Sequence, residues 1–379
     1  MSVLLPKIAI LDSSNLGKAA ADFWNAQASR RKRCHDFISR LSDANVFIAF
    51  TMTHVTELLR HENDRVVRDR IAFLGELPHI AWLRPQSRER FPSDVVCLFA
   101  RELEAFVRHG CRDHRSIVEH IRPSLWETGT GKEMFGTKSE MWDVLSSVAR
   151  SMLEHDKYVA SICRADFGVR NLTIGECRRR SPQFPDGWEG FIQEMVKDLE
   201  TQLVDHGDSR LEDHRGASEQ FTSETLKILQ ECQRLKGDWI LNLADNQGID
   251  RDLISDNTTV SEFGALVAYN LQLKLFAKNS GLDDVSVKGV PLGSLPGYTL
   301  GTRLELLQNR EQRISGSNLG DARIAALGLY ADALEADKRT VNHLSVLLRK
   351  EHAFCDLMCP YFKVSTYHEI PTHIASKCA

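Results

Sequence analysis

The stretch KIAILDSSNL, Lys7 to Leu16, sets a short apolar run against an aspartate, two serines and an asparagine. An apolar run of this length that ends in polar residues is typical of a buried β-strand. Asp12 then has two interpretations. It is an aspartate that starts a turn, or it is a metal ligand at the carboxyl edge of a parallel sheet, where open α/β folds place their sites. Other carboxylates at the same edge would favour the second interpretation.

Strands and helices alternate over the segment 1–85. Residues 45–50 and 79–83 have the β-branched and aromatic content of further strands. Helical spacing of apolar residues covers 17–42, and Thr53 is expected to cap a helix that contains Glu57. This order predicts a parallel sheet with crossover helices.

From residue 86 to residue 310 the alternation stops and helical spacing predominates. The spacing predicts helices over 94–109, 139–165, 188–206, 223–235 and 261–278. The Gly- and Pro-rich stretch VPLGSLPGYTLG, Val290 to Gly301, predicts a loop that leads back to the sheet. We therefore expect a mostly helical inserted domain over 86–310.

The α/β pattern returns near the C-terminus. The sequence predicts helices over 321–330 and 341–349, and strands over 333–336 and 362–364. The predicted fold is α/β, a three-layer α/β/α arrangement with a central, mostly parallel sheet. Its domain is discontinuous, formed by residues 1–85 and 311–379 on either side of the helical insertion.

The bulk composition describes an ordinary globular chain. Hydrophobic residues make up 42% and charged residues 26%, with a formal net charge of −4, so no global basic field exists to attract nucleic acid. No apolar run reaches the roughly 18 residues of a membrane helix. The nine cysteines include no CxxC pair, which makes reduced thiols and a cytoplasmic location the expectation.

Four carboxylates take places that can meet at one sheet edge. Asp12 follows the first strand, Glu57 lies early in the helix after the second, Asp321 opens a helix, and Asp337 follows the strand at 333–336. Converging carboxylates repel one another unless a cation neutralises them. Mg²⁺ and Mn²⁺ prefer such oxygen ligands and support phosphodiester cleavage.

Each acid also has a plainer interpretation. Glu57 could complement a helix dipole, Asp321 could be an N-cap, and Asp337 could pair with Lys338 or Arg339 across a turn. Asp332 is a further candidate acid, but it precedes its strand and so belongs to the opposite edge.

The order and spacing of these acids resemble the PIN-domain nucleases. The resemblance lies in ILDSSNL (Ile10 to Leu16), FTMTHVTELLRH (Phe50 to His61), GSNLGDARIAALGLYADALEADKRT (Gly316 to Thr340) and the closing strand near FKVST. PIN domains carry an Asp after the first strand, a Glu in a T-x-x-E-L-L helix start, an Asp that opens a helix, and a last Asp after the strand that follows this helix. The matching positions are Asp12, Glu57, Asp321 and Asp337.

The resemblance implies a PIN-like fold and a nuclease that uses one or two Mg²⁺ or Mn²⁺ ions held by these four acids. It implies RNA as the substrate more than DNA, and an endoribonuclease in a toxin–antitoxin or antiphage setting, controlled by a regulatory protein or by homo-oligomerisation. The alternatives are a structure-specific DNA nuclease and an inactive PIN-like scaffold that binds nucleic acid or protein. Small PIN toxins lack an insertion of this size, so their substrates do not carry over.

Several other residues are candidates for substrate contact. Ser14 and Asn15 could orient Asp12 or bind phosphate, and Lys338, Arg339 and Thr340 could hold the scissile phosphate. The basic runs RRKR (Arg30 to Arg33) and RRR (Arg178 to Arg180) could follow a nucleic-acid backbone, although a solvated helix face is the commoner meaning of such runs. The stretch ETGTGKE (Glu127 to Glu133) lacks the first Gly and the final Ser or Thr of a phosphate-binding loop, which excludes that motif.

Overall fold

The computed structural model describes residues 5–85, 92–136, 139–162, 171–180, 188–208, 210–234, 238–308 and 317–377. The chain divides into two compact units. The first comprises Met1–Leu153, Gly293–Gln308 and Ser317–Ala379, and the second consists chiefly of Glu154–Leu292. The first unit is larger than the predicted domain of 1–85 plus 311–379, because a strand and several helices beyond residue 85 belong to it.

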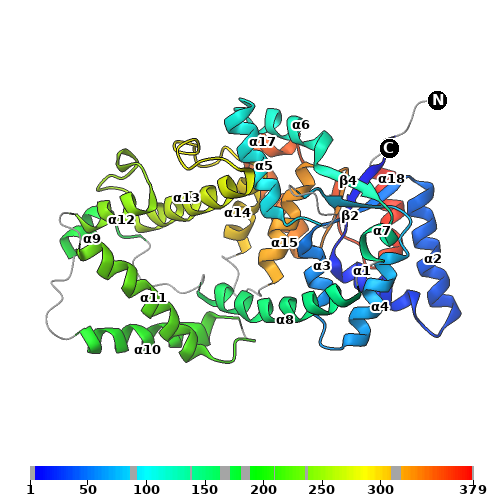
Figure 1. The fold of residues 1–379 in the computed structure, drawn as a ribbon, viewed down its shortest axis with the longest axis horizontal. Helices are drawn as coiled ribbons and strands as arrows, with labels where there is room; N and C mark the ends of the chain where they lie inside the picture. The colour runs from blue at the N-terminus through cyan, green and yellow to red at the C-terminus, as the bar shows by residue number, and fades with distance from the viewer. Residues whose placement is uncertain are drawn as a thin grey trace. The chain divides into compact units, whose positions relative to one another are not determined.

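The first unit is built on a mixed sheet of six strands, and the predicted α/β class is confirmed (Figure 1). The strands are β1 (Lys7–Ile10), β2 (Val46–Phe50), β3 (Ile80–Leu83), β4 (Trp126–Gly129), β5 (Ala333–Glu335) and β6 (Tyr361–Phe362). Their order is β4-β3-β2-β1-β5-β6. The β3–β4 pair is antiparallel, and the other four pairs are parallel.

The central pair of strands joins the two ends of the chain. Ala9 and Ile10 of β1 lie opposite Ala333 and Leu334 of β5. Since the pairing is parallel, the residues that follow both strands emerge at one edge of the sheet. The first unit is therefore discontinuous in sequence.

Both faces of the sheet are covered. Ala9, Ile48 and Trp82 belong to a core shared with the helices that precede β3. The alternate residues Ile10 and Ala81 are also fully buried. Strands buried on both faces account for the nearly continuous apolar runs in their sequences.

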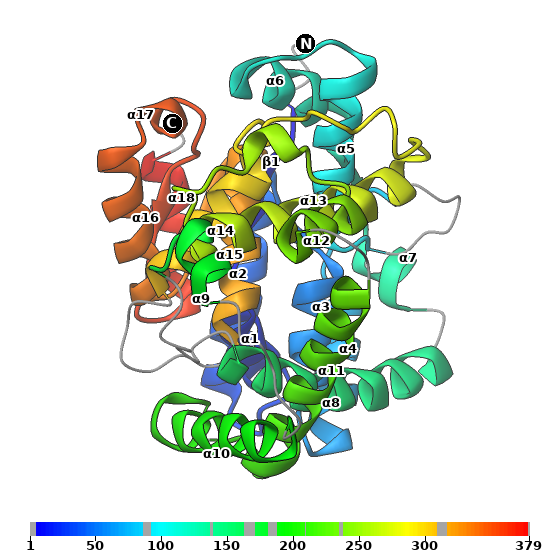
Figure 2. The same ribbon diagram turned by 90° about the vertical axis from the view of Figure 1, so that its left-hand side faces the viewer.

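The helices of the first unit flank this sheet. They are α1 (Ser13–Phe23), α2 (Ala28–Asp43), α3 (Met52–Leu59), α4 (Asp64–Gly75), α5 (Val95–Arg108), α6 (His114–Leu125), α7 (Gly131–Phe135), α14 (Pro296–Gln308), α15 (Ser317–Ala326), α16 (Lys338–Lys350), α17 (His352–Cys355) and α18 (Ile370–Lys377), with 3₁₀ turns at η2 (Leu327–Leu329) and η3 (Tyr367–Glu369). Helices α14 and α15 lie side by side in both views (Figures 1 and 2).

The second unit is helical. It contains α9 (Ile174–Arg180), α10 (Trp188–His206), α11 (His214–Arg234), α12 (Trp239–Gln247), the short η1 (Arg251–Leu253) and α13 (Val260–Ser280), and α8 (Ser139–Ile162) crosses the boundary between the units. The predicted helices over 94–109, 188–206 and 261–278 are confirmed within a few residues.

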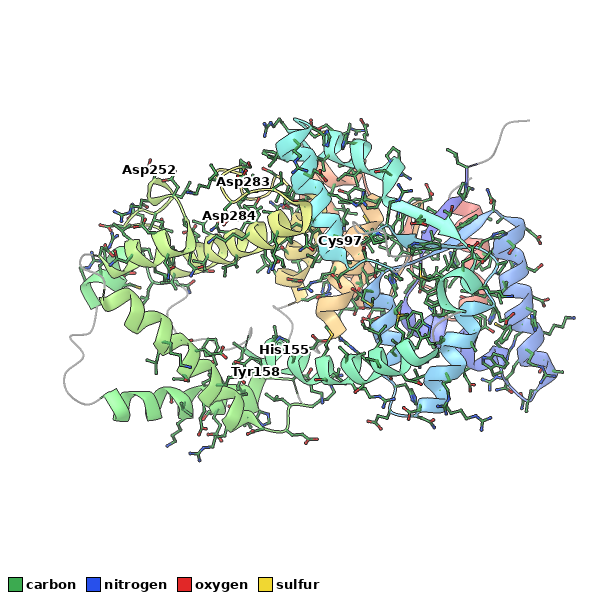
Figure 3. All side chains as sticks on the ribbon, viewed as in Figure 1. Cys97, His155, Tyr158, Asp252, Asp283 and Asp284 are labelled. Atoms are coloured by element: carbon green, nitrogen blue, oxygen red, sulfur yellow. The ribbon has the colours of Figure 1, made fainter. Side chains whose placement is uncertain are left out.

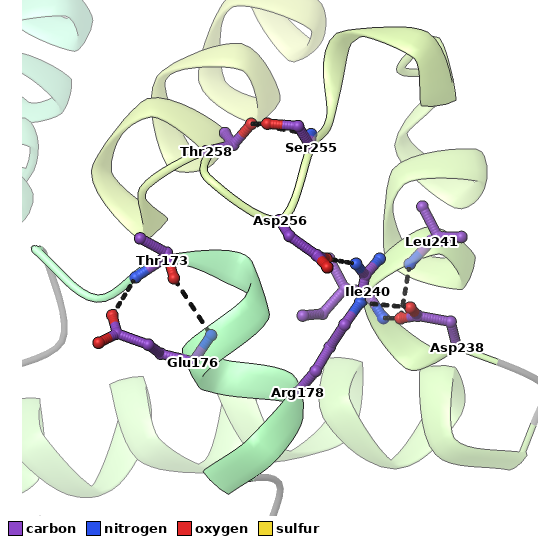
Figure 4. A network of polar contacts seen from close by, with 9 residues as sticks. All are labelled: Thr173, Glu176, Arg178, Asp238, Ile240, Leu241, Ser255, Asp256 and Thr258. Carbon is purple, nitrogen blue, oxygen red and sulfur yellow. Dashed lines mark hydrogen bonds and ion pairs between the residues drawn. The ribbon is translucent and has the colours of Figure 1, made fainter.

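An ion-pair network organises one end of the second unit (Figure 4). The Arg178 guanidinium contacts the carboxylates of Asp238, at 2.5 Å, and Asp256. Asp238 also accepts hydrogen bonds from the backbone N–H groups of Ile240 and Leu241, at 2.9 and 3.3 Å, and so caps α12. One arginine thereby connects α9, the start of α12 and the segment before α13.

Two predicted elements differ from the structure. The predicted helix over 17–42 is two helices, α1 and α2, because the chain leaves helical geometry between Trp24 and Gln27. Helix α3 is capped by Thr51 rather than Thr53, and His54 completes the capping box by accepting from the Thr51 N–H at 3.2 Å. Burial lowers the pKa of His54 to about 4, so the ring is neutral.

Two further differences fall in the predicted insertion. The predicted loop at Val290–Gly301 contains the start of α14, where Pro296 takes a position in the first turn that suits proline. At Gly297 a Cβ would come within 2.5 Å of the Glu102 carboxylate, so the glycine serves a close approach. The rejected phosphate-loop stretch forms β4 and the start of α7, an edge strand whose sequence WETG has no apolar alternation.

Two further findings concern the cysteine thiols and the apolar length of the helices. The thiols of Cys34, Cys97, Cys111, Cys177, Cys355 and Cys359 are free, and Figure 3 shows Cys97 on α5. Among the described residues, no helix is both long and apolar enough to cross a membrane.

Candidate functional site

Asp12 serves both as a turn residue and as a member of an acidic cluster. Its Oδ1 accepts a hydrogen bond from the Ser14 N–H at 2.7 Å and so caps α1. Its own N–H donates to the Glu335 carboxylate at 3.0 Å. The two interpretations of the opening stretch are therefore compatible, because the cap fixes the carboxylate at the edge of the sheet.

Glu57 reaches the same edge from α3. The Ser13 hydroxyl donates a short hydrogen bond to its carboxylate. On the other side lies Gly320 of α15, where a Cβ would come within 2.7 Å of Glu57 Oε1. The absence of a side chain at Gly320 lets α15 approach the Glu57 carboxylate. Gly320 directly precedes Asp321, so the same approach brings Asp321 close to Glu57.

Asp321 lies in the second turn of α15, because that helix begins at Ser317. It is neither the opening residue nor the N-cap of the helix. Burial, together with the carboxylates of Glu57, Asp12 and Asp337, raises the pKa of Asp321 to about 8, against the opposing charge of Arg339. Each of the three other acids therefore lies close enough to Asp321 to disfavour its charged form.

Asp337 is the second residue after Glu335, which ends β5. Its carboxylate accepts the Thr340 N–H at 2.7 Å and caps α16. Asp12, Asp321, Glu335 and Asp337 line a common cavity of about 20 Å³. That is room for one water molecule or ion.

Glu335 is a fifth acid that the sequence interpretation missed. It is the last residue of β5 and 2% exposed, and the Asn15 amide donates to it at 2.9 Å. Burial raises the pKa of Glu335 to about 7, as does Asp12, against hydrogen bonds from the Asp12 N–H and the Asn15 amide. The available signal was a carboxylate inside the otherwise apolar run ALEA.

The five candidate residues for substrate contact differ in how far they are exposed. Ser14 is exposed, Asn15 is buried against Glu335, and Thr340 is buried in the cavity wall. Lys338 and Arg339 are exposed in the first turn of α16.

Asp332 lies at the amino end of β5, away from the cavity. It accepts the Ile8 N–H at 2.8 Å and pairs with Arg122 at 2.6 Å. Its contacts hold the start of the sheet together, and it does not line the cavity.

Three arginines of the basic runs contact other groups of the protein. Arg30 pairs with Asp22 at 2.9 Å, and Arg31 donates to the carbonyls of Asn25 and Ala26. Arg178 is held in the network of Figure 4. These side chains contribute to the local structure of their helices.

The chemistry of the cavity fits a hard divalent cation. Its charged side chains are carboxylates, the donor type that Mg²⁺ and Mn²⁺ prefer, and their mutual repulsion would be relieved by a cation. Across the described ranges, no three His, Cys, Asp or Glu side chains are already arranged as a ligand set. Side-chain rotations would be needed to bring the carboxylates onto one ion.

The chain matches no family model, no curated protein and no solved structure. The geometry of the cavity and the chemistry of its side chains are therefore what indicates a function.

Proposed function

We propose that the protein is a Mg²⁺- or Mn²⁺-dependent nuclease of the PIN type that hydrolyses phosphodiester bonds. The observation that supports this most is the meeting of Asp12, Asp321, Glu335 and Asp337 around one small cavity at the sheet edge. The raised pKa of Asp321, about 8, agrees with this geometry, since perturbed acids in a small polar cavity are a signature of functional sites. Repulsion between the clustered carboxylates destabilises the fold, and a bound cation would remove this repulsion.

In this proposal Asp12, Asp321 and Asp337 hold the ion from the wall of the cavity, and Glu335 lies beside them. Glu57 is not among the residues that line the cavity, and it would complete the ligand set from α3. A bound Mg²⁺ or Mn²⁺ supplies Lewis-acid activation of a water and of the phosphate. Ser13 and Asn15 orient Glu57 and Glu335 through the hydrogen bonds described above. The exposed Lys338 and Arg339 attract the phosphate backbone to the edge of the cavity.

The resemblance to PIN nucleases extends the proposal to RNA as the substrate. It also suggests an endoribonuclease under the control of a partner, as in toxin–antitoxin or antiphage systems. Cleavage of matched RNA and DNA oligonucleotides by the purified protein distinguishes this proposal from a DNA-directed nuclease.

Replacement of Asp12 tests the proposal directly. Asparagine caps helices as well as aspartate does, so Asp12→Asn preserves the start of α1 while it removes one charge. We expect cleavage of a labelled single-stranded RNA with Mn²⁺ to fall by about 100-fold or more, because a carboxylate ligand is lost. Excess EDTA should abolish cleavage by the wild-type protein.

Asp332→Asn is the matched control. Asp332 follows α15 and precedes β5 but lies outside the cavity, so its amide variant should keep full activity. Full activity of Asp12→Asn, or of the wild-type protein in EDTA, would contradict the proposal. Calorimetric titration with Mn²⁺ gives the second readout, and no binding by the wild-type protein would favour an inactive scaffold.

A further inference from the structure

A second concave site lies outside the sheet edge, along β6. This groove has a volume of about 700 Å³ and is bounded by α16, by the residues on either side of β6 and by α18. It shares no lining residue with the carboxylate cavity. The proposed nuclease reaction does not use it.

The polar groups of the groove are cations and hydrogen-bond donors. Lys363 and Lys377 line it together with His373. The hydroxyls of Ser345 and Tyr361 also line it and lie 3.2 Å apart. The described residues of the lining include no aspartate or glutamate, and no salt bridge of either lysine occurs in the described part of the chain.

The strand itself turns backbone groups toward the groove. The carbonyls of Pro360 and Phe362 accept hydrogen bonds from the Leu334 N–H in β5 and from the Ala336 N–H just after it, at 3.0 and 3.1 Å. By the alternation of a strand, the backbone of Tyr361 faces the other way, and its carbonyl accepts from the Lys377 ammonium at 3.4 Å. The Tyr361 N–H therefore faces the same space as the two lysines.

The groove also has an aromatic and apolar wall. His373 stacks on Phe362, with ring centroids 5.2 Å apart and planes inclined by 14°. The Lys377 ammonium lies 5.7 Å from the centre of the Phe362 ring. Val341, Met358 and Tyr361 provide further apolar surface. An inorganic phosphate would fill only a small part of this volume, which is in the range of small-molecule sites.

The geometry points to a binding site for a nucleoside monophosphate. Its phosphate pairs with Lys363 and Lys377 and accepts hydrogen bonds from His373 and the Tyr361 N–H. Its base and sugar lie against the wall formed by Tyr361, Met358 and Val341. The site is distinct from the carboxylate cavity, so occupancy by a nucleotide would be a separate property of the protein.

Calorimetric titration of the full chain tests this inference, with EDTA present so that the carboxylate cavity holds no metal. The probes are AMP, UMP, adenosine and inorganic phosphate. We expect AMP or UMP to bind saturably. Adenosine and inorganic phosphate should each bind with an affinity lower by about tenfold or more, since each makes only part of the contacts of the nucleotide. The double variant Lys363→Gln/Lys377→Gln should weaken nucleotide binding by about tenfold or more, because two charge-assisted hydrogen bonds are lost.

Lys350→Gln is the control, an exposed lysine on α16 that does not line the groove. Asp12→Asn should bind nucleotide like the wild-type protein, which separates this site from the proposed nuclease site. The inference is overturned if neither nucleotide binds, if the double variant binds as tightly as the wild type, if phosphate alone binds as tightly as AMP, or if Asp12→Asn abolishes binding.

Discussion

At the scale of single residues, Asp321 combines a functional placement with a stability cost. An acid whose pKa is raised on folding is stabilised in its protonated form, so its contribution to stability is greatest below its ordinary pKa of 3.8 and declines until the pH passes about 8. In metal-free protein at high pH, the native state holds a buried charge among three other carboxylates.

We therefore predict that Asp321→Asn stabilises the metal-free protein. The gain in free energy of unfolding should be on the order of a few kcal/mol near pH 9 and should vanish toward pH 4, since each unit of pKa shift corresponds to about 1.4 kcal/mol. Urea denaturation in EDTA at several pH values measures the difference. A variant that is no more stable than wild type at pH 9 would show that the neighbouring acids do not strain this position.

The sequence could place Asp12, Glu57 and Asp337 near one sheet edge, because each directly follows a strand or lies early in the helix after one. The sequence predicts that Asp321 opens its helix, whereas it lies in the second turn. Glu335 could not be found in the same way, because it is part of β5 and a strand pattern gives no reason to expect a buried charge there. Its contacts with the Asp12 N–H and the Asn15 amide depend on a register between strands from opposite ends of the sequence. Such a pairing is a product of the tertiary structure.

At the scale of elements, α14 shows how one helix can be capped by another. Glu102 of α5 is fully buried and accepts hydrogen bonds from the Gly297 and Tyr298 N–H groups, at 2.6 and 3.3 Å, and from the Tyr330 hydroxyl, at 2.5 Å. A carboxylate from a distant segment thus satisfies the free N–H groups of the first turn. The residue directly before α14 is Leu295, which has no side chain that can cap the helix.

The same glutamate should make stability depend on pH. Burial raises the pKa of Glu102 to about 7, against the three hydrogen bonds it accepts. The native state therefore holds a proton that the unfolded state loses between pH 4.5 and 7, and stability falls as the pH rises through this interval.

We predict that Glu102→Gln flattens this dependence. Between pH 5 and pH 8 the wild-type protein should lose roughly 3 kcal/mol more stability than the variant, because glutamine keeps an acceptor oxygen without a titrating proton. Parallel denaturation curves at the two pH values measure the effect. Glu104→Gln, on the same helix and paired with Arg108 at the surface, should keep the wild-type pH dependence. Identical slopes for all three proteins would contradict the prediction.

At the scale of the whole molecule, the division into two compact units predicts separable unfolding transitions. Arg178 provides a probe of the second unit alone, because its two carboxylate partners, Asp238 and Asp256, lie within that unit. Its removal leaves these two acids without the cation that bridges them.

Arg178→Ala should lower the free energy of unfolding of the second unit by about 1–3 kcal/mol and leave the first unit unchanged. Differential scanning calorimetry should show one transition shifted to lower temperature and the other in place. Arg215→Ala, which removes an exposed pair with Glu219 on α11, should change neither transition by a measurable amount. A single transition that moves as a whole in Arg178→Ala would contradict the independence of the units.

The pairing of β1 with β5 has a consequence for the order of events during synthesis. The amide of Asn15 must find the carboxylate of Glu335, near the other end of the chain. As the polypeptide leaves the ribosome, β1, β2 and β3 are available early, while β5, the other neighbour of β1, emerges only after residues 84–332. Pairings of such high contact order form slowly, after loop closure over the whole intervening chain. The acidic cavity is therefore assembled only after β5 and Asp337 have been made, and a shorter nascent chain cannot carry out the chemistry proposed for it.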